Sequence, residues 1–290
     1  MNPGVSQKAI QAKGFWRAQR WLLLRRLSQV LVLAMFASGP WLGVWILKGN
    51  LSASLLLDTV PLSDPLTLLQ SMVAGHWPAT MALVGGAIVL AIYLLLGGRL
   101  FCSWVCPVNL VTDAASWTRH RLNLPTRPGN PKGRYAVLAG VLLGAAATGS
   151  LVWEWVNPIT LSIRVITLGS LTGLWMLLAI FLFDLVIRRD GWCGTLCPVG
   201  SFYALVNRFG WLKIRLPARE KCDDCMACYK ACPEPQVIKI PLKDIGAEPV
   251  IRDPACTLCG RCVDVCPENV FEIGSRRKAS EPLQTVEIKP

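Results

Sequence analysis

The sequence predicts a membrane α-helical protein that ends in a small α+β domain. Of the 290 residues, 53% are hydrophobic and the mean hydropathy is +0.43, which is too apolar for an ordinary soluble domain. Four uncharged runs of 19 to 22 residues precede Gly210. After Gly210 tryptophan becomes rare, charged residues recur and cysteines cluster, which indicates a separate domain boundary near residues 211–220.

Each of the four apolar runs is long enough to cross a bilayer as a helix. At ~1.5 Å per residue, such a run covers about the 30 Å of the hydrocarbon core. The predicted spans are Leu27–Leu47, Trp77–Gly98, Tyr135–Trp153 and Val165–Phe183.

Basic residues alternate between the two sides of these spans. Residues 1–26 and 98–134 hold six each, whereas the two intervening loops hold only Lys48 and Arg164. This positive-inside pattern predicts a multi-pass protein of the bacterial inner membrane, with both termini and the C-terminal domain in the cytoplasm. The pattern also accounts for most of the net charge of +12, so no nucleic-acid partner is indicated.

The membrane part contains an internal repeat. The motif DPLTL at Asp64–Leu68 is matched by NPITL at Asn157–Leu161, and each is followed by an apolar run and then by C-x3-C-P. Two helix hairpins of the same design are therefore expected, related by an axis along the membrane normal.

Two cysteine runs near the C-terminus carry the strongest chemical signal. Both Cys222–Pro233 and Cys256–Pro267 read C-x2-C-x2-C-x3-C-P, the bacterial iron–sulfur pattern in which the fourth cysteine ligates the other cluster. Zinc is the alternative for C-x2-C pairs, but two complete runs with both prolines favour iron–sulfur clusters. The predicted ligands are Cys222, Cys225, Cys228 and Cys266 for one [4Fe–4S] cluster, and Cys256, Cys259, Cys262 and Cys232 for the other.

These patterns together divide the chain into four parts. Residues 1–26 form a basic cytoplasmic segment and residues 27–210 a four-helix membrane domain. Residues 211–277 form an α+β ferredoxin-like domain with two [4Fe–4S] clusters. Residues 278–290 are expected to be a disordered tail.

The two C-x3-C-P motifs indicate one kind of site less specifically than the two C-terminal cysteine runs do. Pro107 and Pro198 suit the first position of a helix, which places the second cysteine of each motif at a helix N-terminus that favours a thiolate. Three interpretations remain open: one shared metal, redox or iron–sulfur site, a redox dithiol in each repeat, or buried structural thiols. The cysteines concerned are Cys102, Cys106, Cys193 and Cys197.

The electron donor is expected to be a quinol. The sequence has only two histidines, no C-x-x-C-H, no G-x-G-x-x-G that opens a helix and no P-loop, so neither haem nor nicotinamide nor ATP chemistry is indicated. Quinol oxidation releases protons, and Asp184 and Glu154 at the membrane faces are candidate acceptors. Asp184 could instead pair with Arg188, and Glu154 could lie in the headgroup layer.

Several motifs together resemble the NapH family of ferredoxin-type membrane subunits. They are SGPWLGVWILKGN, DTVPLSDPLTLLQS, RLFCSWVCPVN, WEWVNPITL, GWCGTLCPVG, CPEP and CGRCVDVC. The likeness runs from about Gly14 to Ile273. It implies four membrane helices, cytoplasmic ends, two [4Fe–4S] clusters and a quinol dehydrogenase role. It also implies a periplasmic iron–sulfur partner of the NapG type, then a c-type cytochrome and the periplasmic nitrate reductase.

Relatives that serve copper-enzyme maturation or methylamine oxidation share the C-x3-C-P plan. The alternative function is therefore a membrane iron–sulfur protein that binds or reduces copper through these thiols during metalloenzyme assembly. The six methionines do not cluster in a loop, so quinol oxidation is the favoured hypothesis.

Overall fold

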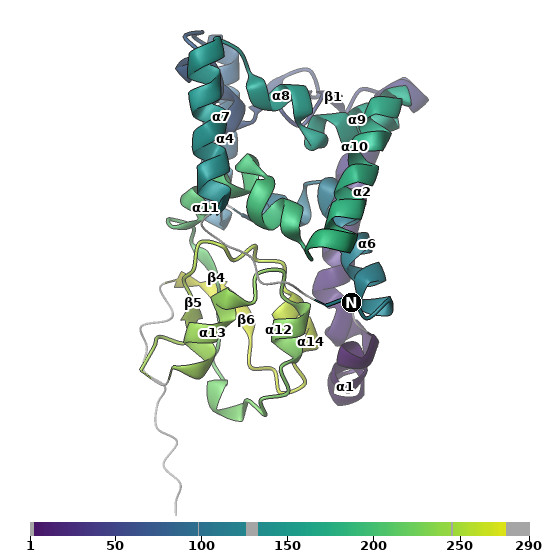
Figure 1. Cartoon of the computed structure of the whole chain (residues 1–290), viewed down its shortest axis with the longest axis vertical. Coiled ribbons are helices and arrows are strands. Elements are labelled where there is room, and N and C mark those ends of the chain that lie inside the picture. The colour runs from purple at the N-terminus through teal and green to yellow at the C-terminus, as the bar shows by residue number, and fades with distance from the viewer. Residues whose placement is uncertain (1–2, 98, 126–132, 245, 277–290) are drawn as a thin grey trace, which may run out of the picture.

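A mostly helical part lies above a small α+β part in the computed structural model, which describes residues 3–97, 99–125, 133–244 and 246–276 (Figure 1). Helix α1 (Pro3–Lys13) lies beside the α+β part in Figure 1. The helical part consists of α2 (Phe15–Leu42), α3 (Pro65–Val73), α4 (Thr80–Leu96), α5 (Leu100–Trp104), α6 (Val108–Arg121), α7 (Gly133–Thr148), α8 (Val152–Val156), α9 (Pro158–Leu168), α10 (Leu171–Leu182) and α11 (Pro198–Asn207), with the π-helical turns η1 (Phe183–Ile187) and η2 (Trp192–Leu196). The predicted tail 278–290 lies outside the described residues.

Among the described residues, only α2 is both long and apolar enough to cross a membrane on its own. It has 28 residues and ends where Gly43 adopts the left-handed conformation, with φ of 72°. The helix therefore stops before the end of the predicted span Leu27–Leu47, and Leu47 instead begins a strand.

The fourth predicted span is not one continuous helix. Gly169, with φ of 63°, caps α9, and α10 begins two residues later. The expectation of one helix over Val165–Phe183 is wrong because this left-handed glycine breaks it. Shorter apolar helices correspond to the second and third spans, Thr80–Leu96 and Gly133–Thr148, and the apolar helix Leu171–Ile187 covers most of the fourth. That four segments cross the bilayer stays a prediction.

A three-stranded antiparallel sheet, which was not predicted, follows α2. Its strands β1 (Leu47–Gly49), β2 (Ala53–Leu56) and β3 (Val60–Ser63) pair in sequence order. Helix α4 packs directly on β3, and a Cβ at Gly85 would lie 3.0 Å from the backbone of Pro61. The glycine thus permits the close approach of helix and sheet.

The repeated DPLTL and NPITL motifs both begin helices in the same way. Asp64 caps α3 by accepting a hydrogen bond from the amide of Thr67, and Asn157 caps α9 through the amide of Ile159. Each cap is followed by proline at the first helical position, where its missing N–H costs nothing. The repeat in the sequence therefore corresponds to a repeated helix start.

The α+β part is built on a second three-stranded sheet. Strand β4 (Leu212–Arg215) lies between β5 (Val250–Ile251) and β6 (Glu272–Ser275), antiparallel to both. The remaining elements are η3 (Arg219–Lys221), α12 (Ala227–Ala231), α13 (Gln236–Lys243) and α14 (Arg261–Val265). Ile214 and Ile251 of the sheet and Ile238 of α13 share one apolar core, so the small α+β fold is as expected.

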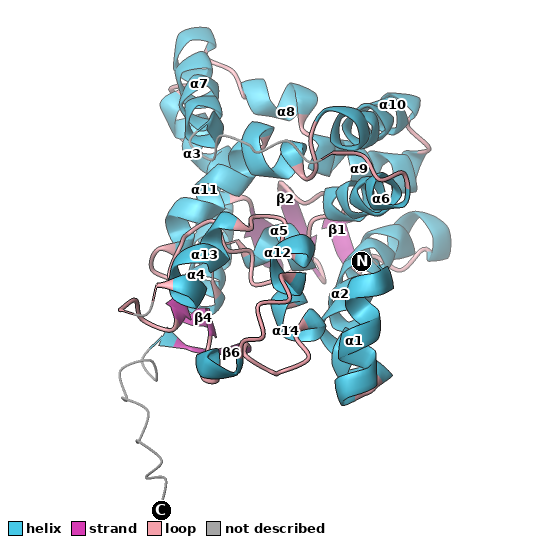
Figure 2. Ribbon diagram, turned by 60° about the horizontal axis from the view of Figure 1, so that its bottom comes forward, coloured by secondary structure: helices cyan, strands magenta, loops and turns pink. Residues whose placement is uncertain are grey.

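The N-terminal helices hold the α+β part against the helical part. Both α1 and α2 contact α14, beside which they lie in Figure 2. The Asp264 carboxylate accepts hydrogen bonds from the amides of Trp21 and Leu22 at 3.2 and 2.9 Å. Lys13 Nζ donates to the Val263 carbonyl at 2.6 Å. The basic N-terminal segment is therefore part of the packing between the two parts.

Candidate iron–sulfur site

The cysteines of the two C-terminal runs surround two separate small cavities. One cavity is lined by Cys222, Cys225, Cys228 and Cys266. The other is lined by Cys232, Cys256, Cys259 and Cys262. Each cavity thus takes three thiols from one run and the fourth from the other run, and these are the two sets of residues that the sequence predicts as ligands.

Both runs wrap around their cavities with the same backbone conformation. The residues two and four positions after each first cysteine are left-handed: Asp224 and Met226 have φ of 56° and 57°, and Leu258 and Gly260 have φ of 51° and 70°. These residues bend the chain between the cysteines so that three thiols face one centre. The short helices α12 and α14 follow directly.

The donor set fits [4Fe–4S] clusters better than zinc. Within the part of the chain that the structure describes, no three His, Cys, Asp or Glu side chains are placed to hold a single metal ion. A zinc site requires four ligands within about 2.3 Å of one centre, whereas a cubane cluster accepts thiolates that are spread around a larger body.

The four thiols of the C-x3-C-P motifs gather in the helical part. Cys106 and Cys197 immediately precede the proline at the start of α6 and α11, as predicted, and backbone amides of each first turn donate to the sulfur. All six pairs among Cys102, Cys106, Cys193 and Cys197 are close enough to interact electrostatically. The fold therefore brings the two repeats together at their cysteines.

A further cavity joins these thiols to the α+β part. Cys102 and Cys193 line it from the helical part, and Cys259 lines it from the α+β part. Thiols of the C-x3-C-P motifs and of the second C-terminal run thus border one space.

A buried ion-pair cluster holds this junction together, and the sequence analysis missed it. Arg99 and Arg134 both donate to one oxygen of Glu234, at 3.1 and 2.9 Å, and the three side chains are at most 8% exposed. Arg99 also donates to the carbonyls of Ala255 and Cys193 at 2.5 and 3.4 Å, and to the Cys102 thiol. The hint in the sequence is that Arg99 and Glu234 flank cysteine motifs.

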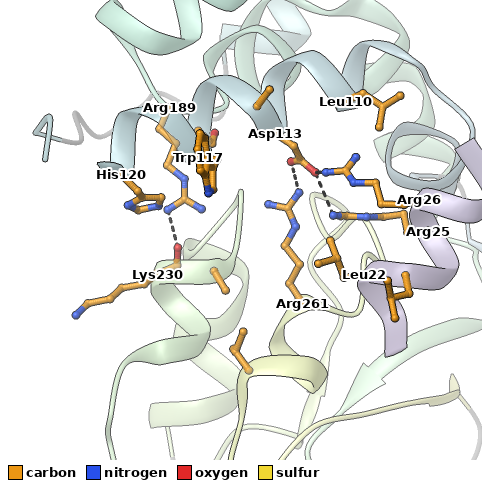
Figure 3. Close-up of a pocket in the computed structure, with 15 residues that line it drawn as sticks. Leu22, Arg25, Arg26, Leu110, Asp113, Trp117, His120, Arg189, Lys230 and Arg261 are labelled. Atoms are coloured by element: carbon orange, nitrogen blue, oxygen red, sulfur yellow. Dashed lines mark hydrogen bonds and ion pairs between the residues drawn. The ribbon is translucent and has the colours of Figure 1, made fainter. Parts of the chain in front are cut away.

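A second buried cluster centres on Asp113 of α6 (Figure 3). Its carboxylate pairs with Arg25 at 3.0 Å and also with Arg26 and Arg261. Burial alone would raise the pKa of Asp113, but the guanidinium groups of Arg261, Arg25 and Arg26 lower it to about 2. One carboxylate therefore connects α2, α6 and α14.

A cavity beside this cluster lies between α2, α6 and the α+β part. It has a volume of about 400 Å³, and its walls include Leu23, Trp117, His120 and Arg189 (Figure 3). No sequence motif indicated it, because its walls come from segments that are far apart in the chain.

The two predicted proton acceptors lie in different surroundings. Asp184 is fully buried in η1; one carboxylate oxygen accepts from the Trp192 amide at 2.9 Å, and the other has no hydrogen-bond partner among the described residues. Glu154 lies in α8, at the end far from the α+β part in Figure 1. There it accepts from Ser52 and Asn157 at 2.9 and 2.8 Å. The structure does not bring the two acids together.

Known proteins resemble the whole chain. A family described as "4Fe-4S binding domain" matches residues 78–125 and 170–218, and one described as "4Fe-4S dicluster domain" matches residues 221–270. "Ferredoxin-type protein NapH" of Escherichia coli is 50% identical over 94% of this chain and 95% of that protein. The chain belongs to the NapH family. It is a ferredoxin-type 4Fe–4S electron-transport protein, as the sequence motifs predict.

Two further relatives match this chain over a similar share of its length. NapH of Haemophilus influenzae is 49% identical over 91% of this chain and 92% of that protein. "Methylamine utilization ferredoxin-type protein MauN" of Methylorubrum extorquens is 43% identical over 95% of this chain and 96% of that protein. No solved structure matches the chain.

Proposed function

We propose that this NapH-type protein oxidises quinol in the bacterial inner membrane. It passes the electrons through iron–sulfur clusters toward an iron–sulfur partner of the NapG type, a c-type cytochrome and the periplasmic nitrate reductase. The observation that carries this proposal is the cavity bordered by Cys102, Cys193 and Cys259, because it connects the thiols of the apolar helices to those of the ferredoxin-like part. The 50% identity to NapH supports the same partners.

The two cysteine-lined cavities are the proposed cluster sites. A [4Fe–4S] cluster in each would accept and release one electron at a time. The chain's own contribution is to supply the eight thiolates, to bury them and to neutralise their charge. Arg261 lies between Cys259 and Cys262 and interacts electrostatically with Cys259, so it reduces the repulsion within that group.

The four C-x3-C-P thiols form a proposed shared redox or metal site. Their mutual proximity supports one site over two independent dithiols. The match of both motifs to a family described as "4Fe-4S binding domain" supports a cluster there. Backbone amides at the two helix N-termini donate to the sulfurs of Cys106 and Cys197, and hydrogen bonds of this kind would support sulfur ligands of a bound metal or cluster.

The topology follows from the charge distribution. Both termini and residues 211–277 lie on the cytoplasmic side of a membrane domain formed by residues 27–210. Asp184 and Glu154 remain proposed proton acceptors at the two faces. One buried carboxylate oxygen of Asp184 has no hydrogen-bond partner in the described part of the chain, which supports Asp184 as an acceptor. Glu154 is supported less, because it already accepts hydrogen bonds from Ser52 and Asn157.

Quinol and NADH should behave differently as electron donors. We expect that the full-length protein, purified with its clusters and placed in liposomes without oxygen, is reduced by a ubiquinol or menaquinol analogue and not by NADH. The loss of visible cluster absorbance measures the reduction, and dithionite gives the fully reduced reference. Equal reduction by NADH in the absence of quinone would contradict the proposal.

Exchange of the fourth ligands can be tested with two reciprocal variants. Cys266→Ser should damage the cluster held by Cys222, Cys225 and Cys228, whereas Cys232→Ser should damage the other cluster. Each substitution should remove about half of the C-terminal cluster signal, because the serine oxygen replaces one of the four thiolates of only one of the two clusters. Electron paramagnetic resonance of the reduced proteins identifies the cluster that remains. Loss of the same cluster in both variants would refute the exchange.

A further inference from the structure

The cavity of about 400 Å³ combines apolar and polar walls (Figure 3). Leu22, Leu23, Leu110 and Trp117 supply apolar surface from α2 and α6. A volume of this size with apolar walls and a few polar groups is typical of small-molecule sites. Leu23 and Trp117 are also 40% and 46% exposed, so the apolar side of the cavity is open to the surroundings.

The cavity also contains hydrogen-bonding groups that are not saturated. Arg25 is 1% exposed, and its Nε and Nη1 have no hydrogen-bond partner among the described residues. His120 lies on the same wall as Trp117, one helical turn further along α6 (Figure 3). A ligand that accepts a hydrogen bond from the guanidinium and donates one to the imidazole would supply hydrogen-bond partners for both groups.

The cavity adjoins both groups of C-terminal cysteines. Ala231 and Val265 form part of its wall and are the sequence neighbours of Cys232 and Cys266. Arg189 closes this side by donating to the carbonyls of Lys230 and Cys232, at 2.7 and 3.5 Å. A molecule in the cavity would therefore lie next to the residues that hold the proposed clusters.

We propose that this cavity binds the head group of the quinol, with His120 as the first proton acceptor. This inference rests on the proposed function and adds the site to it. Helix α2 passes the cavity at Leu22–Arg26, directly before the predicted span that begins at Leu27. The head group would therefore enter from the headgroup layer of the membrane, with its isoprenoid tail against Leu23, Leu110 and Trp117.

At this site quinol loses two electrons and two protons, both O–H bonds break and two carbonyl groups form. The electrons leave one at a time to the adjacent clusters. The proton of the hydroxyl group beside His120 passes to the imidazole, which is partly exposed and releases it to water, and the proton of the other hydroxyl group passes to water directly. The Arg25 guanidinium donates a hydrogen bond to the oxygen that becomes a carbonyl.

The charges around His120 favour this role. Arg189, Asp190, Arg119 and Lys230 are the charged groups that surround it. Burial, followed by the positive charge of Arg189, lowers the pKa of His120 below its ordinary value of 6.5. The imidazole is therefore neutral at neutral pH and can accept a proton.

An anionic lipid headgroup is the competing occupant, because five cations and one carboxylate line the cavity. Three of these cations, Arg25, Arg26 and Arg261, already pair with Asp113, and Arg189 pairs with Asp190 at 3.1 Å. The apolar walls next to the proposed clusters favour the quinol.

Filling the cavity tests the site. Ala114 is exposed and lines the cavity, whereas Ala139 is also exposed, on α7, and is not among the residues that line it. Ala114→Trp in the full-length protein should lower kcat/KM for a quinol analogue about tenfold or more, and Ala139→Trp should leave it unchanged. Fluorescence quenching of a hydroxyquinoline N-oxide inhibitor, which mimics quinol, should show the same loss of binding without turnover. Dithionite should reduce the clusters of both variants to the same extent.

The outcomes distinguish failure of the proposed quinol site from failure of the proposed function. If the unmodified protein does not oxidise quinol, the proposed function fails. If it does, and the two tryptophan variants behave alike, the quinol site lies elsewhere. Loss of phosphatidylglycerol binding with unchanged inhibitor binding in Ala114→Trp would also overturn the site and assign the cavity to lipid.

Replacing the imidazole tests the proton acceptor. His120→Gln keeps a hydrogen-bonding side chain but removes the base, so we expect kcat to fall by roughly 10²-fold with little change in KM. The rise of kcat with pH through the histidine pKa should disappear, whereas inhibitor binding should persist. An unchanged pH profile with unchanged kcat would exclude His120 as the acceptor.

Discussion

Replacing Glu234 with glutamine is expected to lower the free energy of unfolding by about 3–5 kcal/mol, because two buried guanidinium groups lose their shared counter-charge. Arg99 and Arg134 are each 2% exposed at the side chain, so water cannot replace the carboxylate. Arg99 also contacts Cys102 and Cys193, so we expect the variant to lose electron transfer between the helical and α+β parts. Denaturant titration in detergent micelles, followed by visible cluster absorbance, measures the first effect.

The matched control for Glu234→Gln is Glu248→Gln. Glu248 pairs with Arg252 at 2.5 Å, but these side chains are 58% and 45% exposed, and surface pairs of this kind contribute about 1 kcal/mol or less. Electron transfer can be compared by rapid mixing with the quinol analogue. If both variants unfold at the same denaturant concentration, Glu234 does not link the two parts.

Replacing Asp113 with asparagine should have an effect of similar size, about 3 kcal/mol or more, because three guanidinium groups then lose their common partner. They come from residues 25 and 26 of α2 and from Arg261 of α14, so the variant should also loosen the α+β part from the helices. Faster amide hydrogen exchange in α14 would report this loosening.

The contribution of Asp113 to the free energy of unfolding should also decrease as the pH falls. Its pKa is about 2 in the folded protein and 3.8 ordinarily, so the unfolded chain binds the proton first as the pH falls. The stabilisation, about 2 kcal/mol from this shift, is therefore complete above the ordinary value and is lost as the pH falls toward 2. In the Asp113→Asn variant, this part of the dependence of the free energy of unfolding on pH should be absent.

Asp58→Asn provides the control for Asp113→Asn. Asp58 pairs with Lys48 at 3.3 Å, and both side chains are more than half exposed. This control should change the free energy of unfolding by less than about 1 kcal/mol. Equal effects of the two substitutions would show that the three arginines around Asp113 need no counter-charge.

The sequence alone determined the features that depend on local spacing. The C-x2-C-x2-C-x3-C-P runs predicted the two groups of four cysteines, because this spacing requires the tight wrap that Asp224, Met226, Leu258 and Gly260 adopt. The prolines after the C-x3-C motifs likewise predicted the starts of α6 and α11. Family membership followed from motifs of the same local kind.

Only the tertiary structure decided the features that depend on distant partners. The pairing of Glu234 with Arg99 and Arg134 and that of the three arginines with Asp113 join residues up to 148 apart in the sequence. The cavity beside His120 joins still more distant segments, because both Leu22 and Val265 line it. No periodicity or motif encodes such pairs, since a charged residue in a sequence has the same appearance whether it is solvated or buried. Which charges become buried is set by the packing of α2, α6 and α14, and burial makes their pairing strong.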